Sequence, residues 1–202
     1  MRYGSDSVLL VVDIQNDFLP GGALAVPEGD QVIEPINLLA ERFQNVILTQ
    51  DWHPEAHISF ASSHEDKQPY EMIELDYGPQ ILWPDHCIQG ERGAEFASGL
   101  NIPKAELVIR KGHHPTIDSY SAFLEADRAT RTGLASYLQE RGIRNVYCAG
   151  LALDFCVSWT AIDAITAGFD TFIIEEACRA IDTNGSLEHA RHQWDEMGIV
   201  IM

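Results

Sequence analysis

The sequence has few basic residues. Lysine and arginine together number 13, only three of them lysines, against 31 acidic residues, so the formal net charge is −18 at pH 7. A field of this sign repels phosphate backbones and anionic lipid, which argues against nucleic-acid and membrane partners. The sequence also lacks an apolar run of about 18 residues, the length of a membrane span, and a signal-peptide pattern at its start. We therefore predict a cytoplasmic protein that acts on a small neutral or cationic molecule.

Cysteine is also scarce, and its spacing matches neither a CxxC pair nor a zinc finger. The four cysteines are Cys87, Cys148, Cys156 and Cys178. Without a signal peptide, they are expected to be free thiols in a reducing compartment. One of them could be a nucleophile, which composition alone does not identify.

The chain alternates short apolar runs with helical patterns. With 202 residues, 46% of them hydrophobic, it is long enough for one well-buried core. Continuous apolar runs are typical of strands covered on both faces, and they occur at 8–12, 46–48, 107–109, 146–149, 172–174 and 199–201. Helical patterns occupy 30–42, 134–141, 155–167 and 187–197. We predict a single α/β domain over residues 1–202, with a doubly wound, mostly parallel six-stranded sheet and helices on both faces.

One segment interrupts this alternation. Residues 51–104 contain only eight Ile, Leu or Val, yet hold four of the eight histidines and two of the four tryptophans. A long segment without its own core is usually disordered or functional. The clustered imidazoles and indoles favour function, so we predict that this segment forms a metal and substrate site.

Polar residues follow the apolar runs where ligands bind in open α/β sheets, beyond the carboxyl ends of the strands. An acid, Asp13, follows the first run; Lys111 follows the third; Cys156 lies just after the fourth. With Asp154 as N-cap, Cys156 would occupy the first turn of a helix, where the dipole can lower a thiol pKa from ~8.5 to about 3.5–7.5. Cys156 is then a candidate nucleophile, with a small buried apolar residue as the alternative.

Asp13 and Lys111 have an ordinary and a catalytic interpretation. Asp13 could be a base that takes the thiol proton, or a turn aspartate. Lys111 could orient both groups electrostatically, or be a solvated surface lysine. The convergence of an acid, a lysine and a thiol on one sheet edge favours catalysis.

A second candidate group is a metal site. Asp51 and His53 are two residues apart at a strand end, so their side chains should point to the same side. His86 could complete an open Asp/His/His set, whose mixed ligation suits zinc, iron(II) or manganese(II). His57 and His64 are spare candidates, although loop histidines are commonly just solvated.

Five ordered motifs carry a family resemblance. They are VVDIQNDF at 11–18, DWHP at 51–54, WPDHC at 83–87, RKG at 110–112 and LALDFCV at 151–157. Together they resemble the nicotinamidase (pyrazinamidase) family of isochorismatase-like cysteine hydrolases, over about residues 7–201. The segments 120–123 and 182–186 fit as well. Leu153 departs from the pattern, since many relatives have threonine there.

The resemblance implies an activity and a role for each matching residue. It implies metal-dependent hydrolysis of nicotinamide, and of pyrazinamide, to the acid and ammonia through a thioester, in a chain that could form a homo-oligomer. It implies one divalent ion, zinc first with iron or manganese as alternatives, that binds the pyridine nitrogen. The implied residues are a triad of Asp13, Lys111 and Cys156; the metal ligands Asp51, His53 and His86; aromatic walls Phe18 and Trp83; and an oxyanion hole of the N–H groups of Ala152 and Cys156, with a cis Leu151–Ala152 peptide. It assigns no role to His57, Ser59, His64, His113 or His114.

Two alternatives remain. Related enzymes of the superfamily hydrolyse carbamoyl amides, ureidoacrylate or isochorismate, and the Asp51/His53/His86 set favours the nicotinamidase branch over them. The other alternative is a non-catalytic sensor of a pyridine or a metal, against which the intact Asp13/Lys111/Cys156 set argues.

Overall fold

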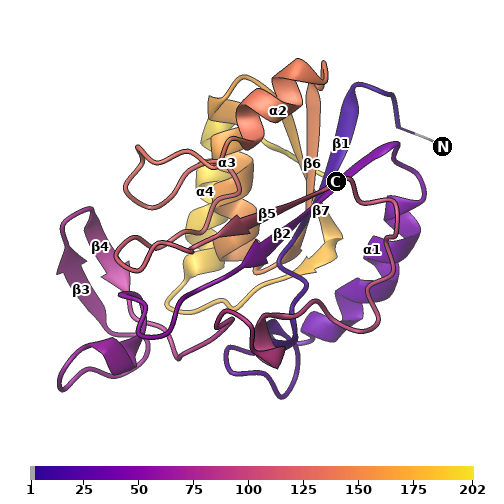
Figure 1. Ribbon diagram of the computed structural model, residues 1–202. Helices are drawn as coiled ribbons and strands as arrows, with labels where there is room; N and C mark the ends of the chain where they lie inside the picture. The colour runs from indigo at the N-terminus through magenta and orange to yellow at the C-terminus, as the bar shows by residue number, and fades with distance from the viewer. Residues whose placement is uncertain (1–2) are drawn as a thin grey trace.

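Residues 3–202 are described by a computed structural model, whose centre is a parallel sheet of six strands (Figure 1). Its order is β5-β2-β1-β6-β7-β8, and every adjacent pair is parallel. The strands are β1 (Ser7–Val12), β2 (Asn45–Asp51), β5 (Leu107–Lys111), β6 (Asn145–Leu151), β7 (Asp170–Arg179) and β8 (Val200–Ile201). All six predicted strands are therefore confirmed, as is the α/β fold class.

Helices cover both faces of the sheet, as predicted. Helix α1 (Ile33–Ala40) lies on one face, and α2 (Leu134–Glu140), α3 (Ser158–Thr166) and α4 (Ser186–Met197) lie on the other (Figure 1). Right-handed crossovers require this division, because the chain moves one way along the sheet from β1 to β2 and the opposite way from β6 to β8. Within residues 3–202, no helix has both the length and the apolar character needed to cross a membrane.

The strand order reverses between β1 and β6, the two central strands. All six residues of β1 are buried, which explains its continuous apolar run. The segments that follow β1 and β6 leave the sheet in opposite directions, so a crevice opens between them at the carboxyl ends of the strands. Asp13 follows β1 and Cys156 follows β6, which places both beside this crevice.

The segment 51–104 is ordered but contains no α-helix. It forms an antiparallel hairpin of β3 (Met72–Leu75) and β4 (Gly78–Ile81), which extends away from the main sheet (Figure 1). The sequence did not predict this hairpin, because both strands are four residues long and mostly exposed or half-buried. Short 3-10 turns are formed by Asn16–Phe18, Gly29–Val32, Ala61–Ser63 and Arg92–Ala94.

The prediction that Asp154 is a helix N-cap is wrong. The chain leaves β6 through a π-helical turn, Leu153–Val157, and α3 begins only at Ser158. The Asp154 carboxylate accepts hydrogen bonds from the N–H groups of Ile181 (3.0 Å) and Asp182 (2.8 Å) instead. It therefore ties the turn to the segment after β7. The Leu151–Ala152 peptide is cis, as the resemblance implied.

Candidate active site

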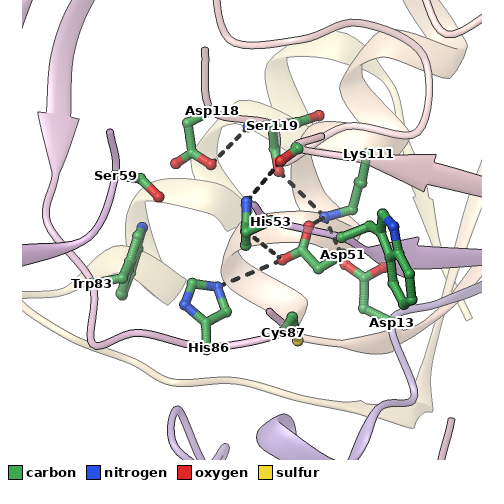
Figure 2. Close-up of polar contacts among 12 residues, drawn as sticks. Asp13, Asp51, His53, Ser59, Trp83, His86, Cys87, Lys111, Asp118 and Ser119 are labelled. Carbon is green, nitrogen blue, oxygen red and sulfur yellow. Dashed lines mark hydrogen bonds and ion pairs between the residues drawn. The ribbon is translucent and has the colours of Figure 1, made fainter. Parts of the chain in front are cut away.

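Lys111 is the centre of the polar cluster at the carboxyl edge of the sheet. Its side chain is fully buried at the end of β5, and its Nζ lies 2.8 Å from Asp13 Oδ2 and 2.5 Å from Asp51 Oδ1 (Figure 2). It also donates to Ser119 O at 3.3 Å and to Cys156 Sγ at 3.4 Å. One buried ammonium thus links two carboxylates and the thiol, so the surface-lysine interpretation is excluded.

Asp13 is held in place from β2. Its Oδ1 accepts a hydrogen bond from Thr49 Oγ1 at 2.6 Å, and Thr49 Oγ1 also accepts the Asp13 N–H at 3.1 Å. Apart from its ion pair with Lys111, Asp13 Oδ2 has no hydrogen-bond partner among the described residues. A ligating oxygen of Asp13 and the Cys156 Sγ lie within 4.8 Å of each other. The carboxylate therefore has an oxygen available for proton exchange with the thiol.

The pKa of Cys156 differs from the expectation. Burial raises the pKa of the thiol well above its usual value; Lys111 opposes that effect, and Asp13 adds to it. The predicted lowering of this pKa by a helix N-terminus is therefore wrong, since Cys156 is buried in a π turn beside a carboxylate. A neutral thiol of this kind needs a base to become a nucleophile.

The charges of the two carboxylates and the lysine are set by burial and by one another. Burial raises the pKa of Asp13, against the opposing effect of Lys111. Burial would also raise the pKa of Asp51, but Lys111 and His53 outweigh it and hold that pKa well below its usual range. For Lys111, burial lowers the pKa, whereas Asp13 and Asp51 together hold it well above the usual value. Asp51 is thus the permanent anion and Asp13 the more readily protonated one.

The three predicted metal ligands lie together on the other side of Asp51. Asp51 Oδ2 is 3.5 Å from His53 Nε2 and 3.7 Å from His86 Nε2, and all three side chains are buried (Figure 2). With metal–ligand bonds of about 2.0–2.2 Å, two ligand atoms at a tetrahedral angle are roughly 3.4 Å apart. The separations fit a single divalent ion.

Both imidazoles are oriented for ligation through Nε2. His53 Nδ1 donates to Gly112 O at 2.9 Å, and His86 Nδ1 donates to Pro84 O at 2.8 Å. A carbonyl only accepts, so Nδ1 of each ring carries a proton and Nε2 is the atom left to bind a metal, the usual arrangement around a metal. Position 112 requires glycine, because its φ is +65° and a Cβ would lie 2.4 Å from the His53 ring. The donor set therefore fits a metal ion.

Hydrogen bonds between two stretches of the 51–104 segment, residues 53–61 and 83–89, bring the histidines together. Residue His53 donates its N–H to Cys87 O at 3.0 Å and accepts from the Gln89 N–H at 2.8 Å. Farther along, the Trp83 N–H donates to Ser59 O at 2.8 Å. Two isolated parallel bridges result, one between His53 and Ile88 and one between Phe60 and Trp83. The site thus depends on contacts between chain segments about 30 residues apart.

Cys156 of the triad and the three residues of the metal group line the same small hollow. Phe18 and Trp83, the predicted walls, line it, and so do Ala152 and Cys156. Its other lining residues are Leu24, Asp51, His53, His86, Asp118, Ser119, Tyr120, Phe155 and Ile181.

Proteins with a similar sequence and fold are known. The isochorismatase domain profile matches residues 7–202. The nicotinamidase of Acinetobacter baylyi is 58% identical over 197 residues, which cover 98% of this chain and 91% of that protein. The chain belongs to the isochorismatase family. A solved nicotinamidase/pyrazinamidase of Acinetobacter baumannii is 59% identical, with a TM-score of 0.99, covering 100% of this chain and 97% of that one.

Two solved relatives of this isochorismatase-family chain carry ligands. A protein of L. infantum in complex with nicotinate has a TM-score of 0.86 and 37% identity, covering 100% of this chain and 95% of that one. The pyrazinamidase of Pyrococcus horikoshii in complex with zinc has a TM-score of 0.79 and 35% identity, covering 98% of each chain.

Sequence reasoning missed several contributors to this isochorismatase-family site. Thr49 follows an apolar run directly, so its place at a strand end was a usable signal that it could contact Asp13. Tyr120 belongs to a motif that matched the family without a role, and its hydroxyl accepts a hydrogen bond from Trp83 Nε1 at 2.9 Å. Leu24 and Ile181 had no signal, because only the packing of distant segments brings them to the hollow.

The unassigned histidines differ in their surroundings. His57 is buried, with its ring centroid 4.3 Å from that of His53, and burial followed by the charge of His53 lowers its pKa to about 4. Its Nδ1 lies 2.7 Å from Ser59 Oγ. His64 donates to Ile58 O at 2.7 Å. His57, which contacts Ser59, thus packs against His53 of the metal group, whereas His64 does not belong to that group.

Proposed function

We propose that this protein is a nicotinamidase, which hydrolyses nicotinamide to nicotinate and ammonia through a thioester on Cys156. The observation that carries the proposal is a buried Asp13–Lys111–Cys156 cluster whose Cys156 lines the same hollow as the Asp51/His53/His86 group. The relatives named nicotinamidase support the reaction, and the nicotinate complex of one solved relative supports a pyridine carboxamide as the substrate. Pyrazinamide, with a ring nitrogen at the equivalent place, is a second expected substrate.

In the first step, Asp13 takes the proton from the Cys156 thiol. The thiolate sulfur then forms a bond to the carboxamide carbon, and the carbonyl π electrons move to the oxygen. Lys111 lies within 3.4 Å of Sγ and 2.8 Å of Asp13, so its charge stabilises the thiolate as it forms. The N–H groups of Ala152 and Cys156, which line the hollow, are assigned to the resulting oxyanion.

In the second step, Asp13 returns its proton to the amide nitrogen. The C–N bond breaks, ammonia leaves, and the acyl group stays on Cys156 as a thioester. Asp13, again a carboxylate, then takes a proton from water, whose oxygen attacks the thioester carbon. The C–S bond breaks, Asp13 returns its proton to the sulfur, and the product leaves as nicotinic acid, which loses its proton to the released ammonia in solution and becomes nicotinate. The raised pKa of Asp13, caused by burial against the effect of Lys111, suits a group that both accepts and donates a proton.

We assign Asp51, His53 and His86 as the ligands of one divalent ion, zinc with iron or manganese as alternatives. Bound there, the ion supplies a Lewis-acidic position for the substrate's ring nitrogen. Phe18 and Trp83 are assigned as the walls that hold the ring flat. The edge-on packing of Trp83 on Phe155, with centroids 5.1 Å apart, keeps that wall rigid.

Purified protein is expected to contain about one divalent transition-metal ion per chain. His53→Ala and His86→Ala should lower metal content strongly, because each removes a ligand. His64→Ala is the matched control, since His64 lies in the same segment and its ring donates to Ile58 O. Elemental analysis of the folded variants measures the content. Equal metal content in His86→Ala and His64→Ala would contradict the ligand assignment.

The choice of amide tests whether the ring nitrogen is recognised. Benzamide has the same carboxamide and ring shape as nicotinamide but no ring nitrogen, so it loses one bond to the metal site and its carbonyl is less well placed. We expect its kcat/KM to be lower by about 10²-fold or more, because a misplacement of ~1 Å can cost that much. Pyrazinamide should remain a substrate. Assays of the three amides at equal metal loading decide the point, and equal values for nicotinamide and benzamide would indicate a broader amidase.

The thiols support a cellular location. All four cysteines are unpaired and buried. We infer that the protein works in the cytoplasm, where thiols stay reduced.

A further inference from the structure

Gln15 forms a two-point clamp on the main chain of Asp51. Its side-chain Nε2 donates to Asp51 O at 2.8 Å, and its Oε1 accepts from the Asp51 N–H at 2.8 Å. A third hydrogen bond runs from Nε2 to Ala94 O at 2.9 Å. Gln15 is fully buried, so no solvent competes for these groups. The amide therefore pairs with the Asp51 backbone as an adjacent strand would.

Asp17, two residues later, holds the backbone next to His86. Its Oδ2 accepts a hydrogen bond from the Cys87 N–H at 2.7 Å, and its Oδ1 accepts from the Ala23 N–H at 3.3 Å. The carboxylate lies directly against Gly93, where an added Cβ would come within 2.0 Å of Oδ2. Only glycine at position 93 leaves room for this placement.

The segment that carries both side chains is itself anchored to residues 92–97. The Asn16 N–H donates to Glu95 O at 3.0 Å, and the Ala97 N–H donates to Ile14 O at 2.9 Å. Asn16 Nδ2 also donates to Arg92 O at 2.8 Å. Residues 13–17 are thus fixed on one side and reach the metal group on the other.

We propose that Gln15 and Asp17 are positioning residues for the metal site, each holding the main chain of one ligand segment. This inference rests on the proposed ligand set of Asp51, His53 and His86. Alternate residues of one five-residue segment then have distinct tasks: Asp13 handles the proton, Gln15 fixes Asp51, and Asp17 fixes the turn after His86. Groups that orient metal ligands commonly contribute about 10- to 100-fold to metal affinity.

A purely structural role would give a different result. Gln15 could serve only to satisfy buried backbone groups, in which case its loss would lower stability without altering metal affinity. Gln50 offers the comparison: it is buried, and its Nε2 donates at 2.8 Å to the same Ala94 O, but its side chain does not hydrogen-bond to the Asp51 backbone. A Gln50 variant therefore loses this hydrogen bond, together with the one that Gln50 Oε1 accepts from Arg110 Nε at 3.1 Å, without freeing the ligand.

The experiment measures Zn²⁺ and Co²⁺ dissociation constants of metal-free protein by competition with a chromophoric chelator. Gln15→Met should raise these constants about 10- to 100-fold and alter the visible absorption of the Co²⁺ form. Gln50→Met should leave both close to wild type. Asp17→Ala should weaken binding, and Asp17→Asn should restore it, because its amide oxygen can still accept the Cys87 N–H. Near-ultraviolet circular dichroism checks that each variant folds.

The outcomes separate this inference from the ligand assignment. His86→Ala serves as the reference for loss of a direct ligand. Wild-type affinity in Gln15→Met and Asp17→Ala, with weak binding in His86→Ala, would overturn the positioning role and leave the ligands standing. Wild-type affinity in His86→Ala would overturn the ligand set itself. If Gln15→Met does not fold, the Asp17→Ala and Asp17→Asn pair decides the question.

Discussion

Cys156→Ala is expected to lower kcat/KM for nicotinamide by about 10⁴-fold or more while leaving the fold intact. The substitution removes the sulfur that is assigned to the thioester, and the lost sulfur is a small part of a buried turn. Ammonia release measures the activity. Mass spectrometry of a quenched wild-type reaction should show a nicotinoyl adduct on the peptide that contains Cys156.

Cys148→Ala is the matched control for this variant. Cys148 is equally buried, in β6 only eight residues earlier, and burial raises the pKa of its thiol above the usual value as well. It does not line the hollow. Its loss should therefore cost some stability and leave kcat unchanged. Substantial activity in Cys156→Ala, or an adduct mapped to Cys87, would show that the nucleophile is misassigned.

Lys111→Met should have the second largest effect, on stability and activity together. The ammonium is the buried counter-ion of both Asp13 and Asp51, and its removal leaves two carboxylates uncompensated. Breaking a buried ion pair in this way costs about 3–5 kcal/mol in the free energy of unfolding. The activity should fall by at least about 10²-fold, because the thiolate loses its nearest positive charge.

The stability deficit of Lys111→Met should grow with pH. Without the ammonium, burial raises the pKa of Asp13 further. The pKa of Asp51 also rises, because Lys111, which mainly opposes the effect of burial there, is gone. The folded variant then binds more protons than the unfolded chain, so its stability falls as pH rises above about 4, the unfolded carboxylate pKa. Urea unfolding of metal-free protein at a series of pH values measures this.

Lys67→Met is the control for the loss of a lysine. Lys67 pairs with Glu71 at 3.1 Å on the surface, with both side chains about 40% exposed. A surface pair of this kind contributes about 0–1 kcal/mol, so stability should change little at any pH. A Lys111→Met deficit that is as small as that of Lys67→Met, or that shrinks as pH rises, would contradict the role of Lys111 as the shared counter-ion.

The strands and the main helices were predictable from the sequence because their signals are local. A parallel strand covered on both faces must be apolar at consecutive positions, and β1 is such a run, buried at every residue. The chemistry at the sheet edge was predictable for the same reason. Ligands bind beyond the carboxyl ends of parallel strands, so Asp13, Asp51 and Lys111 stood out as polar residues that end apolar runs.

Local signals failed where distant segments decide the structure. Asp154 looks like an N-cap, yet its carboxylate binds backbone N–H groups 27 and 28 residues later. A helix N-terminus would lower the pKa of Cys156, yet burial beside Asp13 raises it. The hairpin of β3 and β4 has no continuous apolar run, because it packs outside the main sheet.

The sequence by itself thus determined the fold class and the residue types at the site, since both depend on short-range patterns. Only the tertiary structure decided how those residues interact. The register of β2 and β5 pairs Asp51 with Lys111, and the isolated bridge between His53 and Ile88 brings His86 to Asp51. Gln15 reaches the Asp51 backbone across 36 positions of sequence. These contacts join segments that are far apart along the chain, so no local pattern in the sequence predicts them. Hydrogen bonding and packing in the folded state alone determine them.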